Sequence, residues 1–140
     1  MGYTHYWTPK RTITPEEWVE VSANIKAILD ASGIPLANWS GEEGSSPMFT
    51  DEGIDFNGVE DDGHETMSID RTSMSWDLCK TARKPYDTAV TAILAYLDTV
   101  VGSLQATSDG DREDWEAGVG LAKLALPHLA GKIDFPKEIL

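Results

Sequence analysis

Cysteine and basic side chains are the scarce residues of this 140-residue chain. Its single cysteine, Cys79, excludes an internal disulfide and a zinc site built from cysteines. Only 11 Lys and Arg stand against 24 Asp and Glu, which gives a formal net charge of -13. Most of such a surface repels a phosphate backbone, so the composition excludes general nucleic-acid binding.

Long apolar runs and the common phosphate-binding and nucleophile motifs are also missing. No segment approaches the ~20 apolar residues of a membrane-spanning helix, and the first residues lack the charged start and apolar centre of a signal peptide. We therefore expect a cytoplasmic protein with no membrane partner. The chain contains no Walker loop, no Gly-x-Gly-x-x-Gly sequence and no serine elbow. These absences favour a protein that binds its ligand without turnover and uses no cofactor.

The residues that are present indicate one folded domain covering residues 1–140, since 41% of them are hydrophobic. Residues 3–8 are aromatic and rich in threonine, which predicts a strand. Thr14-Pro15-Glu16-Glu17 reads as a capping box, and apolar residues at helical spacing carry that helix to Gly33. Similar spacing predicts helices over residues 85–102 and 111–127.

The other segments read as strands and loops. Residues 34–52 form the longest irregular stretch, residues 54–56 a short strand, and residues 59–63 an acidic turn. Apolar and polar residues alternate over residues 64–78, with one shift in phase. This pattern predicts either one long strand with a bulge or two strands in a hairpin. Residues 103–107 suit a final strand.

This order of elements predicts an α+β fold, a ferredoxin-like split βαβ sheet with an added C-terminal helix. That topology sets the first strand beside the third, and so His5 near residues 66–69. The tail around Pro136 is expected to be loosely held. A sheet edge or an exposed apolar stripe on the last helix leaves a homo-oligomer open.

The few basic residues are concentrated in one place. Lys80, Arg83 and Lys84 put three of the 11 basic residues within five positions. They lie just before a predicted helix start, whose free N–H groups favour an anion. Arginine offers a planar fork to phosphate oxygens, lysine a mobile charge, and Thr81 a hydroxyl. The segment therefore predicts a site for a small anionic ligand. The alternative is that these cations pair with surface carboxylates and carry no function.

Aromatic residues near this segment favour a nucleotide-like ligand, because they can stack on a base. The candidates are Tyr86 beside the cations and Tyr6 and Trp7 on the first strand. Tyr6 and Trp7 point to opposite faces of a strand, so one packs in the core and the other lines an open sheet face. Asn57, at a strand end, is a further predicted ligand contact.

A second set of residues would suit a metal or acid–base site. His5, His64, Glu65 and Asp109 could supply zinc, manganese or iron ligands, but only if the fold brought distant segments together. That alternative predicts a metal-dependent hydrolase or nucleotide-modifying enzyme. Cys79 beside two cations is either an activated nucleophile or, as is usual, a small buried side chain.

Five segments resemble a family of small proteins from bacteriophages and bacterial genomes. They are Met-Gly-Tyr-Thr-His-Tyr-Trp at the start, Phe56-Asn57-Gly58, Gly63-His64-Glu65, Cys79-Lys80-Thr81-Ala82-Arg83-Lys84-Pro85-Tyr86-Asp87 and Ser108-Asp109-Gly110. The family often has an aromatic residue where this chain has Leu78. The resemblance implies a phage or prophage origin and a host-cytoplasm setting, and it carries no established activity. In that setting a nucleotide-binding protein would sequester a host immune signal, and an inhibitor that binds a host protein is the alternative.

Overall fold

The chain forms seven strands and three α-helices over residues 2–140, the part that the computed structural model describes. The strands are β1 (Thr4–Pro9), β2 (Leu36–Ala37), β3 (Met48–Phe49), β4 (Gly53–Gly58), β5 (Met67–Asp70), β6 (Asp77–Lys80) and β7 (Leu104–Ser108). The helices are α1 (Pro15–Ala31), α2 (Asp87–Tyr96) and α3 (Arg112–Ala125), with a π-helical turn at Leu97–Val101 and 3-10 turns at Glu60–Asp62 and Pro127–Leu129.

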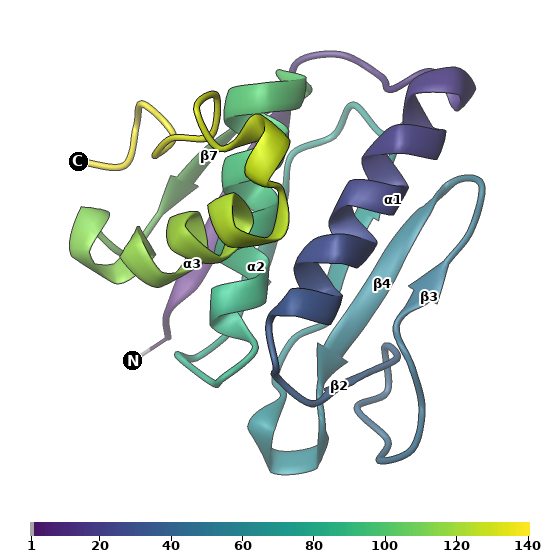
Figure 1. Cartoon of the computed structure of the whole chain (residues 1–140). Helices are drawn as coiled ribbons and strands as arrows, with labels where there is room; N and C mark the ends of the chain where they lie inside the picture. The colour runs from purple at the N-terminus through teal and green to yellow at the C-terminus, as the bar shows by residue number, and fades with distance from the viewer. Residues whose placement is uncertain (1) are drawn as a thin grey trace.

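The strands make two antiparallel sheets, and the three helices lie together on one side of them (Figure 1). One sheet has the order β6-β1-β7, and in the other β4 pairs with β2, β3 and β5. The α+β class with an added C-terminal helix is therefore confirmed. β1 lies beside β6 on one edge and β7 on the other, as the expected topology requires of the first, third and last strands.

The predicted third strand is divided between the two sheets. β5 pairs with β4, whereas β6 pairs with β1, so His5 lies opposite Cys79. The structure thereby corrects the expected neighbour of His5, which is not the segment 66–69. Residues 71–76 between the two strands let each half pair with a different partner.

The helix ends show how local sequence directs the fold. The Thr14 hydroxyl accepts a hydrogen bond from the Glu17 N–H at 3.1 Å, and the Glu17 carboxylate accepts one from the Thr14 N–H at 3.1 Å, which confirms the predicted capping box. α2 begins at Asp87, two residues later than the sequence indicates, and its π-helical turn ends at Gly102 with φ +72°. A residue in the left-handed conformation commonly ends a helix, and glycine adopts this conformation without a steric cost.

The core lies between the helices and the sheets. α2 is its central element, because every residue from Ala89 to Tyr96 is buried. The C-terminal tail also contributes, since Ile133 and Ile139 are buried and the Leu140 carbonyl accepts a hydrogen bond from the Arg112 N–H at 3.0 Å. The expectation of a loosely held tail was wrong. No helix within residues 2–140 is both long enough and apolar enough to span a bilayer.

Candidate functional site

Three distant segments meet at the end of the sheet where β1 begins. The Tyr3 carbonyl accepts hydrogen bonds from the N–H groups of Thr81 and Ala82, just after β6. The Thr4 N–H donates to the Asp109 carboxylate at 3.0 Å, and the Thr4 carbonyl accepts from the Asp109 N–H at 3.0 Å, just after β7. The ends of β6 and β7 are thus fixed against the start of β1.

A chain of side-chain hydrogen bonds runs through this point. His5 is fully buried, and its Nε2 lies 2.6 Å from Asp87 Oδ1 at the start of α2. Its Nδ1 lies 2.8 Å from the Ser108 hydroxyl at the end of β7. The Thr81 hydroxyl donates to the same Asp87 oxygen at 2.5 Å. We call His5, Thr81, Asp87 and Ser108 the His5 junction.

Hydrogen-bond direction defines the tautomer of a neutral His5. An ionised Asp87 only accepts, so His5 Nε2 carries the proton that lies between them. A neutral His5 then presents the lone pair of Nδ1 to Ser108, whose hydroxyl donates to it. The Gly110 N–H also donates to the Ser108 oxygen, at 2.8 Å. The junction is therefore a continuous Ser–His–Asp chain with a defined tautomer.

Two aromatic rings pack against the imidazole. The Tyr3 and Trp115 rings approach it edge-on, with centroid distances of 5.0 Å and 5.2 Å. In the described part of the chain the buried Tyr3 hydroxyl has no hydrogen-bond partner. Burial, helped by the Asp87 and Asp114 carboxylates, raises the pKa of Tyr3 to about 12, although Arg83 and Ser108 oppose this rise. Tyr3 thus remains a neutral phenol, with its O–H near the Ser108 hydroxyl.

Arg83 covers the outer face of the same tyrosine. Its guanidinium carbon lies 3.9 Å from the Tyr3 ring centroid, and one of its N–H groups donates to Asp114 at 3.0 Å. Ala82 and Arg83 both have left-handed backbones, with φ of 52° and 59°. This conformation is unfavourable for residues with side chains and is typical of functional turns. It leaves the Arg83 side chain exposed beside the His5 junction.

The three clustered cations do not converge on one point. Cys79 faces the core, so Lys80 faces the opposite side of the sheet, which it shares with Tyr6 of β1. Arg83 turns to the helix side. Within residues 2–140 no carboxylate lies within ion-pair distance of Lys80 or Lys84. The cations thus surround the turn between β6 and α2 rather than forming a single pocket.

Three of the predicted ligand contacts, Thr81, Tyr86 and Asn57, are buried and have structural roles, and the Thr81 hydroxyl is engaged by Asp87. Tyr86 is fully buried, and its hydroxyl donates to the Glu65 carbonyl at 2.5 Å, so it cannot stack on a ligand. Asn57 is buried too, and its amide holds the chain at residues 58–64 through hydrogen bonds to Gly58 and His64.

Trp7 lies away from the clustered cations, three positions along β1 from the strand start, where it pairs with Asp77. It lines a cavity of about 260 Å³ between β1 and β5. Two arginines also line this cavity, but their guanidinium groups already donate to Glu17, Glu52 and backbone carbonyls. The cavity therefore offers no free cation to an anionic ligand.

The candidate metal ligands are not assembled. His5 is engaged in the junction, Asp109 binds the Thr4 N–H, and the exposed Glu65 accepts a hydrogen bond from the Lys80 N–H at 2.7 Å. His64 is exposed. Among the residues that the structure describes, no three His, Cys, Asp or Glu side chains are grouped to hold a metal. Burial raises the pKa of Cys79 to about 12, which leaves its thiol protonated and unreactive.

No protein family, curated protein or solved structure matches this chain.

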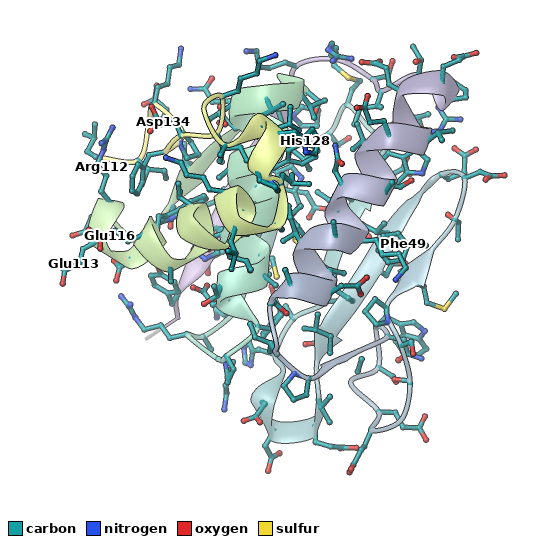
Figure 2. The ribbon with its side chains drawn as sticks, in the orientation of Figure 1. Phe49, Arg112, Glu113, Glu116, His128 and Asp134 are labelled. Atoms are coloured by element: carbon teal, nitrogen blue, oxygen red, sulfur yellow. The ribbon has the colours of Figure 1, made fainter. Side chains whose placement is uncertain are left out.

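The surroundings of the junction are acidic on one side. Figure 2 shows Glu113 and Glu116 projecting outward from the first turns of α3. Asp111 and Asp114 form the capping box at the start of that helix, and hydrogen bonding to the Asp111 N–H, with the Arg83 contact, lowers the pKa of Asp114. An anion that reaches Arg83 must therefore approach from the side of Lys84 and α2.

Sequence reasoning missed Tyr3, Asp87 and Ser108 as functional candidates. Asp87 reads as a first-turn carboxylate and Ser108 as part of a helix cap, because both lie next to helix starts. His5 and Ser108 are 103 residues apart, and only the pairing of β1 with β7 brings them together. No local spacing in the sequence signals that contact.

Proposed function

We propose that the protein binds a small anionic ligand at the turn between β6 and α2, with Arg83 as the anchor. The observation that carries this proposal is the way Arg83 is held. Stacked on Tyr3 and bound to Asp114 through one nitrogen, its guanidinium makes no other hydrogen bond within residues 2–140. A stacked guanidinium keeps its in-plane donors available for phosphate or carboxylate oxygens.

The lysines on either side of the turn support the same function. Lys80 and Lys84 have no carboxylate partner in the described part of the chain, in a protein of net charge -13. Cations left unpaired amid excess acid are available to a ligand. The long-range field repels polyanions, so the ligand is small.

A nucleotide or nucleotide-derived signal is the ligand class that best fits these groups. Lys80 and Tyr6 share the uncovered face of the sheet, where an aromatic ring is accessible to a base. With the resemblance to phage proteins, this supports sequestration of a host immune signal in the host cytoplasm. Arg83 and Lys84 then bind the anionic group, and Lys80 and the Tyr6 ring are reached by a ligand that extends around the edge of the sheet at β6.

Titration of nucleotides, cyclic nucleotides and ADP-ribose derivatives by calorimetry at low salt tests the proposal. We expect one member of this panel to bind, and Arg83→Ala to weaken it by about 10-fold or more, because a charge-assisted hydrogen bond is lost. Lys26→Ala is the matched control, since it removes one exposed positive charge on α1, which is distant in sequence from the turn between β6 and α2. Equal weakening by both variants, or no effect of Arg83→Ala, would remove the turn as the binding site.

A further inference from the structure

The His5 junction has the connectivity of a hydrolase with a serine nucleophile. Ser108 Oγ, the imidazole of His5 and the carboxylate of Asp87 are linked in that order at 2.8 Å and 2.6 Å. Each distance lies within the reach required of a nucleophile, its base and the group that orients the base. The ring is reversed relative to the common arrangement, since Nδ1 rather than Nε2 faces the serine.

The orienting carboxylate is itself well placed. Asp87 accepts from both His5 Nε2 and the Thr81 hydroxyl, and it opens α2, where the helix dipole favours a negative charge. As an acceptor of both hydrogen bonds, it selects the tautomer whose Nδ1 can take a proton. It also balances the charge of the imidazolium that forms when Ser108 gives up its proton.

Tyr3 supplies an independent indication of a ligand. Tyr3 is only 5% exposed, and among residues 2–140 its hydroxyl has no partner in good hydrogen-bond geometry, although the Ser108 hydroxyl lies near it. A side chain at position 110 would collide with this hydroxyl, so the phenol lies against Gly110, the same residue whose N–H binds Ser108 Oγ. An unpaired buried donor close to a nucleophile is where a developing oxyanion would be stabilised.

Access to the junction is from the Ser108 side. His5 is fully buried, whereas Ser108 is partly exposed and Asp109 is exposed. A substrate that approaches Ser108 from this side would leave the histidine in place beside the Tyr3 and Trp115 rings. Exclusion of water from the base strengthens its electrostatic coupling to Asp87.

We infer that Ser108 is a nucleophile for ester hydrolysis, with His5 as its general base, Asp87 as the positioning residue and Tyr3 as the oxyanion donor. Arg83, stacked on Tyr3, would hold an anionic group of the ester. That choice of substrate class rests on the proposed function, whereas the assignment of the nucleophile does not.

The proposed reaction has two steps. Ser108 Oγ attacks the carbonyl carbon of the ester, its proton passes to His5 Nδ1, and the departing alkoxide takes that proton as the ester C–O bond breaks. Water then attacks the acyl-serine, giving one proton to His5 Nδ1, which returns it to Ser108 Oγ as the acid leaves. No oxidant, reductant or further reactant is needed.

A neutral alkyl fluorophosphonate tests the nucleophile directly. The serine oxygen forms a bond to phosphorus, fluoride leaves, and His5 takes the proton, so the folded protein should gain one adduct by intact mass. Peptide mapping should place this adduct on Ser108, and Ser108→Ala should gain none. Asp87→Asn should slow labelling by at least ~100-fold, because the wrong tautomer then faces the serine.

Two further variants separate the possible failures. Ser103→Ala, which removes another buried hydroxyl, should label like the wild type. Lys26→Ala, which changes an exposed residue of α1, should also label like the wild type. The probe is neutral and carries no anionic group for Arg83 to bind, so failure of the binding proposal leaves this test intact. Folded wild-type protein that remains unlabelled, or an adduct on a residue other than Ser108, would overturn the inference and leave the junction a structural network. Circular dichroism of each variant confirms that it is folded.

Discussion

The buried hydroxyl of Tyr86 ties the start of α2 to the segment before β5. It donates to the Glu65 carbonyl at 2.5 Å, so Tyr86→Phe should leave that carbonyl with only the weak Cys79 thiol donor, at 3.5 Å, and lower the free energy of unfolding by about 1–2 kcal/mol. Anion affinity should not change, because the ring does not reach the surface. Urea denaturation and calorimetric titration measure the two effects.

Tyr6→Phe is the control for that substitution. Tyr6 is partly exposed and its hydroxyl makes no hydrogen bond within residues 2–140, so its removal should change stability by less than about 0.5 kcal/mol. A Tyr86→Phe variant as stable as the wild type would show that the Glu65 carbonyl finds another donor. Loss of anion affinity in that variant would return Tyr86 to the ligand site.

The contrast between Thr14 and Ser108 shows which residue roles a sequence reveals. The Thr14 hydroxyl binds the N–H of Glu17, three residues away, so the capping pattern is visible in the local sequence. Ser108 bonds to His5 across the sheet, and that contact depends on strand register. Tyr86 reads as a surface aromatic because it follows three cations, but its place just before α2 directs it into the core.

At the scale of elements, α2 and α3 pack closely because Gly118 has no side chain. A methyl group there would collide with the hydroxyl and Cβ of Thr91 and with the backbone of Ala92. Overpacking of this kind costs about 1–3 kcal/mol, more than the helix propensity gained from alanine, so Gly118→Ala should destabilise the fold. Chemical denaturation measures the difference.

Gly120 provides the matched control on the same helix. Nothing lies within 4 Å of a Cβ at this exposed position, so Gly120→Ala should gain up to about 1 kcal/mol from helix propensity alone. The two variants add the same methyl group two residues apart and should shift stability in opposite directions. If both variants were more stable than the wild type, helix propensity rather than the contact between α2 and α3 would decide the effect at both positions.

Helices were more predictable than strands for a physical reason. Caps, periodic apolar residues and stop residues all lie within a helix's own sequence, which is why α1 and α3 match their predicted ranges closely. Strand pairing depends on other segments. The alternation across residues 64–78 indicated strand, yet nothing local shows that β5 pairs with β4 while β6 pairs with β1.

At the scale of the whole molecule, the net charge of -13 destabilises the compact state through self-repulsion. A domain of this length has a radius of gyration of about 14 Å, and the Debye length falls from about 30 Å at 0.01 M salt to about 10 Å at 0.1 M. Repulsion therefore acts across the whole molecule at low salt and is largely screened at higher salt. The ion pairs other than His5–Asp87 involve exposed or partly exposed side chains, so their loss by screening costs little.

Raising NaCl from 0.01 to 0.3 M should accordingly increase the melting temperature by several degrees, since about 1 kcal/mol corresponds to ~3–5 °C in a domain of this size. Thermal unfolding followed by circular dichroism measures the shift. The variant Glu116→Gln removes a charge that projects from α3 beyond its first turn (Figure 2), so it should be more stable than the wild type at 0.01 M and respond less to salt. KCl should reproduce the effect of NaCl, because screening does not depend on the cation's identity. A melting temperature that falls with salt would mean that the ion pairs outweigh the repulsion, and the excess of acid would then carry no cost in stability.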